Sequence, residues 1–197
     1  MKLTKEMMRL YAVTDRSWLR GQTLCEQVEK ALIGGATLFS HLLDDLSHAK
    51  QLLILGDNAG EIVFDILLVE QLRKQYPELE ILYCVRGKNA LNDATREDAA
   101  YVGMDKLVQI LDNGTGISGT ELDYICDELK QVMATADVIL SKGSGNMESL
   151  AGCGLNIYYI FMCKCQRVAK ILGCENMTGQ FLREKALPPM NPMVGAL

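Results

Sequence analysis

The chain has 197 residues, 49% hydrophobic and 23% charged, a composition typical of one globular domain or of one domain with an appendage. Its formal net charge of −5 argues against general binding to nucleic acid or to an anionic membrane. It has no apolar stretch of the roughly 18–20 residues that a membrane span needs, and its first residues lack the apolar core of a signal peptide, so we expect a cytoplasmic protein.

The middle of the chain alternates between short apolar runs and amphipathic stretches. Because the apolar runs are continuous rather than alternating, each predicts a strand buried on both faces, as in a parallel sheet covered by helices. This order predicts an α/β fold, a three-layer α/β/α sandwich around a mainly parallel, doubly wound sheet. The predicted strands are residues 51–55, 80–85, 107–111, 137–141 and 156–161, and the predicted helices are residues 40–50, 60–75, 94–102, 119–134, 146–152 and 164–171. The helix at 119–134 would begin in a capping box that runs from Ser118 to Glu121.

The two ends of the chain differ from this middle part. Residues 10–16 predict a short strand, and residues 21–33 predict a helix that ends at a pair of glycines. We therefore expect three parts: residues 1–38 as an appended or remodelled strand-helix segment, residues 39–187 as the main domain, and residues 188–197, with three prolines, as an extended tail.

Polar clusters follow four of the predicted strands. The chain reads GDNAGE at residues 56–61, RGKNALNDAT at 86–95, DNGTG at 112–116 and SKGSGN at 141–146. Since the carboxyl ends of parallel strands meet at one edge of a sheet, all four clusters should lie at the same rim, where ligands bind in such folds. The opposite rim carries ordinary connections such as the turn at 75–78. This asymmetry predicts an active site at the carboxyl rim.

Asp57 and Asn58 stand side by side at the end of a predicted strand, with Glu61 close behind. Oxygen ligands without His or Cys partners favour Mg²⁺, Mn²⁺ or a similar ion over structural zinc. The alternative is that Asp57 or Asn58 caps the helix that follows, although two such residues exceed what one cap requires. Asn92 and Asp93 leave the same choice open, since they precede the next predicted helix.

Lys142 lies beside glycines at the end of another predicted strand, and this arrangement suits a phosphate. The glycines at positions 143 and 145 let backbone amides approach a ligand, and the lysine supplies positive charge. The order differs from a Walker A loop, whose lysine follows its second glycine, so an ordinary nucleoside triphosphatase is disfavoured. A flexible turn is the alternative interpretation, and residues 112–114 are explained equally well by a turn or by a site.

Histidine and cysteine chemistry is not indicated. His41 and His48 lie seven residues apart on a predicted helix away from the rim, and no Ser-His-Asp or Cys-His arrangement can be built. The seven cysteines form no CxxC pair, and the pair at 163 and 165 lacks a second cluster at zinc spacing, so we expect reduced structural thiols. Any chemistry at the rim would therefore depend on a metal.

Three ordered motifs resemble those of the damage-control phosphatases, a metal-dependent family. The motifs are GDNAGEIVFD at 56–65, VRGKNALNDAT at 85–95 and KGSGNME at 142–148, within a resemblance that runs from about residue 39 to 184. The resemblance implies an α/β/α phosphatase that acts on small, damaged or surplus phosphometabolites, and it implies that Asp57, Asn58 and Asp93 ligate the metal. Ser144 stands where many relatives carry Gln.

The amino terminus departs from that family, whose members usually carry a substantial helical region ahead of the Asp-Asn strand. Residues 10–16 and 34–38 instead resemble the opening strand and helix of thiamin phosphate synthase, and residues 182–185 resemble the segment that would follow in that enzyme. Because nothing remains of the rest of such a barrel, we interpret this region as a fusion or a remodelled amino terminus. A second subunit could cover an apolar patch left by the change, giving a homo-oligomer.

We expect a metal-dependent phosphoric monoester hydrolase that uses Mn, Co, Ni or Mg and takes a small phosphorylated metabolite. The metal would polarise the phosphoryl group and activate a water. Lys142 and the amides of Gly143, Ser144 and Gly145 would bind phosphoryl oxygens. Asp57, Glu61 and Lys142 are the expected catalytic residues, with Glu61 or Asp112 orienting the water. Arg86, Asn89 and Asn92 are candidates for contacts with the substrate or with the residues that surround the metal ligands.

Two alternatives remain open at this point. One is an S-adenosylmethionine-dependent carboxyl methyltransferase that uses residues 56–60 as a nucleotide-binding turn, although the chain has no G-x-G-x-G there and has a surplus of metal-type oxygens. The other is an inactive remodelled remnant, given the altered amino terminus.

Overall fold

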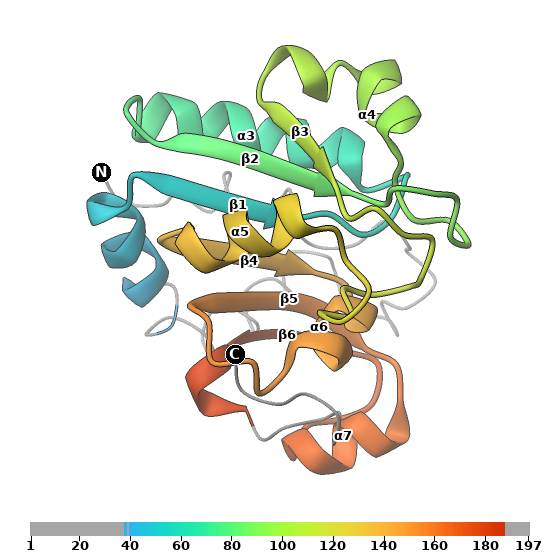
Figure 1. The fold of residues 1–197 in the computed structure, drawn as a ribbon. Coiled ribbons are helices and arrows are strands. Elements are labelled where there is room, and N and C mark those ends of the chain that lie inside the picture. Colours follow the sequence, from blue (N-terminus) through green and yellow to red (C-terminus); the bar gives the residue numbers. More distant parts are fainter. Residues whose placement is uncertain (1–37, 39, 188–197) are drawn as a thin grey trace, which may run out of the picture.

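A computed structural model of the chain describes residue 38 and residues 40–187. The strand expected at 10–16, the helix expected at 21–33 and the tail expected at 188–197 lie outside the described residues. Inside them, a helix covers residues 40–48 and leads directly into the first strand of the sheet. Figure 1 shows this helix at the start of β1.

Six strands form one sheet in the order β3-β2-β1-β4-β5-β6 (Figure 1). The first five run parallel, and β6 pairs antiparallel with β5. The chain builds outward from β1 to β3 and then crosses back to place β4 on the other side of β1, which confirms the doubly wound, mainly parallel sheet. The strands are β1 (Gln51–Leu55), β2 (Glu80–Val85), β3 (Gln109–Asp112), β4 (Val138–Lys142), β5 (Ile157–Cys163) and β6 (Thr178–Arg183).

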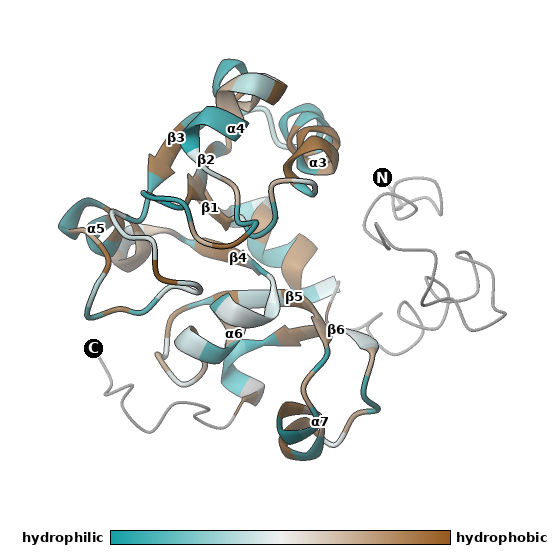
Figure 2. Ribbon diagram, turned by 90° about the vertical axis from the view of Figure 1, so that its right-hand side faces the viewer, coloured by the Kyte–Doolittle hydropathy of each residue, from teal (hydrophilic) through white to brown (hydrophobic). Residues whose placement is uncertain are grey.

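Helices cover both faces of this sheet. One face carries the helix at 40–48 with α3 (Ile62–Gln75) and α4 (Arg96–Val102), and the other carries α5 (Asp127–Thr135), α6 (Ser144–Leu150) and α7 (Gln166–Leu172). Figure 2 shows α3 and α5 on opposite sides of the strands. Two short 3-10 helices, η2 (Met104–Lys106) and η3 (Glu184–Ala186), complete the described chain. The three-layer prediction is therefore confirmed.

Two hydrophobic cores, one on each face of the sheet, explain why the strands are continuously hydrophobic. Along β1, Leu52 and Ile54 belong to the core under α3, whereas Leu53 and Leu55 belong to the core under α5 and α6. All four are buried, so the strand carries apolar side chains on both of its faces. The edge strand β6, with the sequence TGQFLR, lacks such a run and was not predicted.

The helix expected at 119–134 begins at Asp127 instead. The prediction of a helix before residue 127, and of a capping box at its start, is therefore wrong. Thr120 is fully buried, and its hydroxyl and amide are bonded to side chains of α6 rather than to a helix of their own. Tertiary contacts thus override the local capping signal. The capping box that does form lies at the start of α4, where Thr95 and Asp98 bond reciprocally.

The six cysteines among the described residues are all free thiols. Burial raises the pKa of the Cys84 thiol to about 12, and burial together with a hydrogen bond to Cys174 raises that of Cys163 to about 11. Such protonated thiols are poor nucleophiles, in line with the expected structural role. Within the described residues we find no helix long and apolar enough to cross a membrane.

Candidate active site

The candidate site lies where the sheet reverses its order, between the carboxyl ends of β1 and β4. Asp57 follows β1, and Gly143 follows β4 with φ of 85°. A Cβ atom at Gly143 would lie 2.2 Å from the carboxyl carbon of Asp57. Only glycine permits both that backbone conformation and that approach. The carboxylate of Asp57 is therefore packed against the loop that carries Lys142, at the place where doubly wound folds bind ligands.

Backbone hydrogen bonds join the end of β1 to the loop after β2. Asn58 and Asp93 pair as an isolated antiparallel bridge, and the amide of Ala94 donates to the carbonyl of Asp57 at 2.8 Å. The three residues that the family resemblance marks as metal ligands, Asp57, Asn58 and Asp93, are thus brought to one place from two segments.

Neither Asp57 nor Asp93 caps a helix. The N-cap of α3 is Glu61, which makes no side-chain capping bond, and the N-cap of α4 is Thr95. The capping alternative for these two acids is therefore wrong, and their side chains are left to another role.

Lys142 is buried and bonded to two acids, Glu61 at the N-cap of α3 and Asp65 within α3. Its ammonium donates to both oxygens of Asp65, at 2.7 and 2.9 Å, and forms an ion pair with Glu61 at 2.8 Å. The hydroxyl of Tyr83 donates to Asp65 at 2.6 Å. Burial lowers the pKa of Lys142, but Asp65 and Glu61 raise it more strongly, so the pKa lies above its usual range. The lysine expected to bind phosphate is a fixed, charged ammonium.

Negative charge exceeds positive charge around Asp57. Burial, and then the neighbouring carboxylates of Glu61 and Asp93, together raise the pKa of the Asp57 carboxyl to about 6, against the opposing effects of Arg86 and Lys142. A bound cation would relieve this repulsion.

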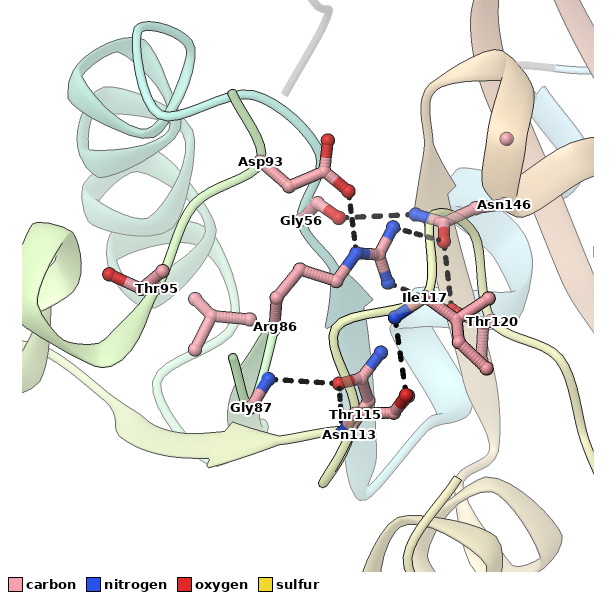
Figure 3. Close-up of polar contacts among 12 residues, drawn as sticks. Gly56, Arg86, Gly87, Asp93, Thr95, Asn113, Thr115, Ile117, Thr120 and Asn146 are labelled. Carbon is pink, nitrogen blue, oxygen red and sulfur yellow. Dashed lines mark hydrogen bonds and ion pairs between the residues drawn. The ribbon is translucent and has the colours of Figure 1, made fainter. Parts of the chain in front are cut away.

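Arg86, a candidate for contacts with the substrate or with residues around the metal ligands, is buried in a network of side chains (Figure 3). Its Nε donates to Asp93 at 2.6 Å, its Nη2 to Asn146 at 2.9 Å and its Nη1 to Thr120 at 3.4 Å. Asn146 in turn donates to the carbonyl of Gly56 at 3.1 Å. The guanidinium therefore links β1, β2 and α6 rather than facing solvent.

Asp112 was one of two candidates to orient water, and its carboxylate is used elsewhere. It pairs with Arg96 at the start of α4, and its other oxygen accepts the amide of Gly114 at 2.9 Å. Glu61, the second candidate, pairs with Lys142 at 2.8 Å and contributes to the raised pKa of Asp57. The choice between the two acids stays a prediction.

The adjoining Asn113 fastens two loops at this rim (Figure 3). Its Oδ1 accepts the amides of Gly87 at 2.9 Å and Thr115 at 3.1 Å. Its Nδ2 is buried and has no hydrogen-bond partner among the described residues. Of the two interpretations of residues 112–114, these contacts support the turn.

The amides expected to bind phosphate are not equivalent. That of Gly143 donates to the carbonyl of Ile160 at 2.9 Å and is used in the sheet. Those of Ser144 and Gly145 belong to the first turn of α6, so only they remain as donors for a phosphoryl group. The remaining predicted side chains, those of Asn89 and Asn92, are exposed on the loop between β2 and α4.

No role was predicted from the sequence for four residues of this site: Asp65, Tyr83, Thr120 and Asn146. Asp65 follows Glu61 by four positions on α3, a spacing that places both acids on one helix face. Tyr83 stands in an apolar strand, and a buried tyrosine hydroxyl usually has a partner. No local signal links Thr120 to Asn146, because they lie 26 positions apart.

The donor set fits a hard divalent cation by its chemistry. Within the described residues no three His, Cys, Asp or Glu side chains form a metal-binding group, and the expected set contains two carboxylates and one amide. The Asn58 Oδ1 accepts the amide of Gly60 at 3.0 Å, and a carbonyl oxygen has a second lone pair for a cation. Asp93 uses Oδ2 for Arg86, so its Oδ1 lies outside that ion pair. Oxygen ligands of this kind suit Mg²⁺ or Mn²⁺.

Comparison with known proteins places the chain in a family. The damage-control phosphatase ARMT1-like domain matches residues 12–178. The uncharacterized protein MJ0202 of Methanocaldococcus jannaschii is 39% identical over 140 residues, which are 68% of this chain and 45% of the relative. The damage-control phosphatase PH1575 of Pyrococcus horikoshii is 32% identical over 154 residues, which are 77% of this chain and 53% of the relative.

The same Pyrococcus protein has a crystal structure, described as a DUF89 family protein, that superposes with a TM-score of 0.74 at 28% identity, over 93% of this chain and 67% of that one. The chain spans about half the length of the curated relatives it matches. The expected boundary between residues 38 and 39 stays a prediction, as does the thiamin phosphate synthase resemblance before it. The chain belongs to the damage-control phosphatase ARMT1-like family.

Proposed function

We propose that this chain is a divalent-metal-dependent phosphatase that hydrolyses monoesters of small phosphorylated metabolites. The observation that carries the proposal is the position of Asp57 at the switch point of the sheet, beside further carboxylates and a buried lysine. Oxygen atoms of the kind that bind hard metal ions lie there beside an ammonium of the kind that binds phosphate. The relatives named damage-control phosphatases support the reaction class.

Asp57, Asn58 and Asp93 would hold the divalent ion, which supplies Lewis-acid polarisation of the phosphoryl group and activation of water when bound. Their oxygens come from two loops that backbone hydrogen bonds hold together. Mn²⁺, Co²⁺, Ni²⁺ and Mg²⁺ are all candidates.

Lys142 would bind the phosphoryl oxygens of the substrate. Asp65 is buried and grips the ammonium through two hydrogen bonds, whereas Glu61 is its partly exposed partner, with 34% of the side chain accessible. A phosphoryl group can therefore replace Glu61 at the ammonium while Asp65 keeps the lysine in place. The displaced Glu61 carboxylate stays near Asp57, where it can accept a proton from the attacking water.

The test is release of inorganic phosphate from p-nitrophenyl phosphate by the purified chain, stripped with a chelator and then loaded with each metal. We expect activity that requires a metal and is lost again on chelation. A panel of sugar, pantetheine and thiamin-pathway phosphates then identifies the substrate class. Clean protein that is inactive with every metal and every ester would contradict the proposal. Tight binding of S-adenosylmethionine without a metal requirement would favour the methyltransferase instead.

A further inference from the structure

We propose that Thr120 and Asn146 are positioning residues for metal ligation, a role that rests on the proposed function. They fix the guanidinium of Arg86 so that its Nε holds one oxygen of Asp93 and leaves the other outside the ion pair. The side chains of both residues bond to Arg86. They act through Arg86.

The guanidinium of Arg86 is held at all three nitrogens (Figure 3). Nη1 and Nη2 point to Thr120 and Asn146, and Nε points to Asp93. Because a guanidinium is a rigid planar fork of donors, fixing its two Nη atoms also fixes the direction of Nε. The side chain is only 4% exposed, so water does not replace these partners.

Asn146 connects this fork to the two strand ends that form the site. It is fully buried, and its Nδ2 donates to the carbonyls of Gly56 at 3.1 Å and Lys142 at 2.7 Å. Its Oδ1 accepts from Arg86 and from the hydroxyl of Thr120. These four bonds use both donors and both lone pairs of the amide. The position of the guanidinium therefore depends on the spacing between the ends of β1 and β4.

Thr120 supplies the third point of attachment from a distant segment. Its hydroxyl donates to Asn146 at 2.8 Å and accepts from Arg86 at 3.4 Å. Its backbone amide donates to the Ser149 hydroxyl at 2.8 Å, so α6 fixes the position of the threonine. These contacts account for the loss of the expected helix start at this position.

The orientation of the Arg86 guanidinium can be tested separately from its positive charge. The positive charge of Arg86 persists when the Thr120 hydroxyl is removed, but the direction of Nε becomes less constrained. Metal affinity should then fall because the Asp93 carboxylate loses its fixed orientation. Partners that orient metal ligands in this way typically change metal affinity by about 10–100-fold when removed. Thr120 is one contact further from the metal, so the lower end applies.

The experiment is calorimetric titration of Mn²⁺ into the metal-free chain, for wild type, Thr120→Val and Thr120→Ser. Valine keeps the shape without the hydroxyl, and serine keeps the hydroxyl. Tyr158→Phe is the matched control, because it removes a buried ring's hydroxyl bond to Asp45 at the opposite rim. We expect the Kd for Mn²⁺ to rise about tenfold in Thr120→Val, to stay within about twofold of wild type in Thr120→Ser, and to be unchanged in Tyr158→Phe.

Each outcome has a distinct meaning. Equal affinity of Thr120→Val and wild type overturns the positioning role and leaves the proposed function intact. Equal weakening in Tyr158→Phe also overturns it, because the loss would then follow stability rather than position. A wild-type chain that binds no Mn²⁺ overturns the proposed function and the positioning role together. Where Thr120→Val does not fold, Thr120→Ala gives the same test.

Discussion

The two rims of the sheet differ in how the charges of their acids are compensated. At the amino rim, Glu184 accepts the amides of Gly152 at 2.8 Å and Gly154 at 3.0 Å and the hydroxyl of Tyr159 at 2.7 Å. At the carboxyl rim, Asp57 is surrounded by further carboxylates and its pKa is raised to about 6. Hydrogen-bond donors compensate the charge of Glu184, which favours stability. The charge of Asp57 is not balanced by its neighbours, which suits the binding of a ligand.

The pKa of Asp45, at the amino rim, is shifted in the opposite direction to that of Asp57. Burial raises its pKa, but hydrogen bonds from Tyr158 and Asn156 and the charge of Arg183 lower it to below the usual value. This acid fastens the helix at 40–48 to β5 and β6. The acids of the amino rim therefore contribute to stability, whereas the electrostatic cost at Asp57 is tolerated where function needs it.

The largest expected effect comes from Lys142→Met. This change leaves the buried Asp65 without its cation, and an uncompensated buried charge typically costs about 3–5 kcal/mol. Hydrolysis should also be lost, because the phosphoryl-binding ammonium is gone. Chemical denaturation of the variant and of wild type measures the stability. If the variant were as stable as wild type, the ion pair of Lys142 with Asp65 would contribute nothing to folding.

Asp57→Asn should lower metal-dependent turnover by about a hundredfold or more while the fold survives. The change removes a formal negative charge from the expected metal ligands and keeps the shape of the side chain. Steady-state kinetics with saturating metal and circular dichroism together check both parts. Near-normal metal affinity and turnover in this variant would end the metal-site interpretation.

The carboxyl rim is predictable because strands buried on both faces are continuously apolar, so the polar clusters after them stand out in the sequence. Asp57, Asn58 and Lys142 do lie at that rim. The bonds of Lys142 to Asp65 and Glu61, and the inward direction of Arg86, are not predictable, because those pairings join segments far apart in the chain. The expected helix start near Thr120 is wrong because contacts with α6 override the local capping pattern.

Glu184→Gln tests the amino rim. The substitution removes the charge that two amides and a tyrosine hydroxyl bind, and hydrogen bonds to a charged group contribute about 1.5–3 kcal/mol. We expect a loss of stability of about 2 kcal/mol with kcat and the Kd for Mn²⁺ unchanged. Thermal unfolding and kinetics on the same sample check the two halves. A fall in turnover at retained stability would show that the rims are not functionally separate.

The smallest expected effect is the pH dependence of stability in the metal-free protein. Folding raises the pKa of Asp57 from 3.8 to about 6, chiefly through burial and then through Glu61 and Asp93. The folded chain therefore binds this proton more tightly than the unfolded chain, so the contribution is fully present below pH 4 and is lost as the pH rises through about 6. At about 1.4 kcal/mol for each pH unit the loss is at most about 3 kcal/mol, and partial exposure of the group reduces it to about 1–2 kcal/mol.

Asp57→Asn isolates this contribution, because an amide does not titrate. In urea unfolding with a chelator present, wild type should lose stability between pH 4 and pH 7 relative to the variant, and the variant should be the more stable protein above pH 6. Added Mn²⁺ should reverse that order, since only wild type retains the full ligand set and binding stabilises the folded state. Parallel stability curves for the two proteins, with or without metal, would show that Asp57 is compensated as fully as Glu184 and would remove the difference between the rims.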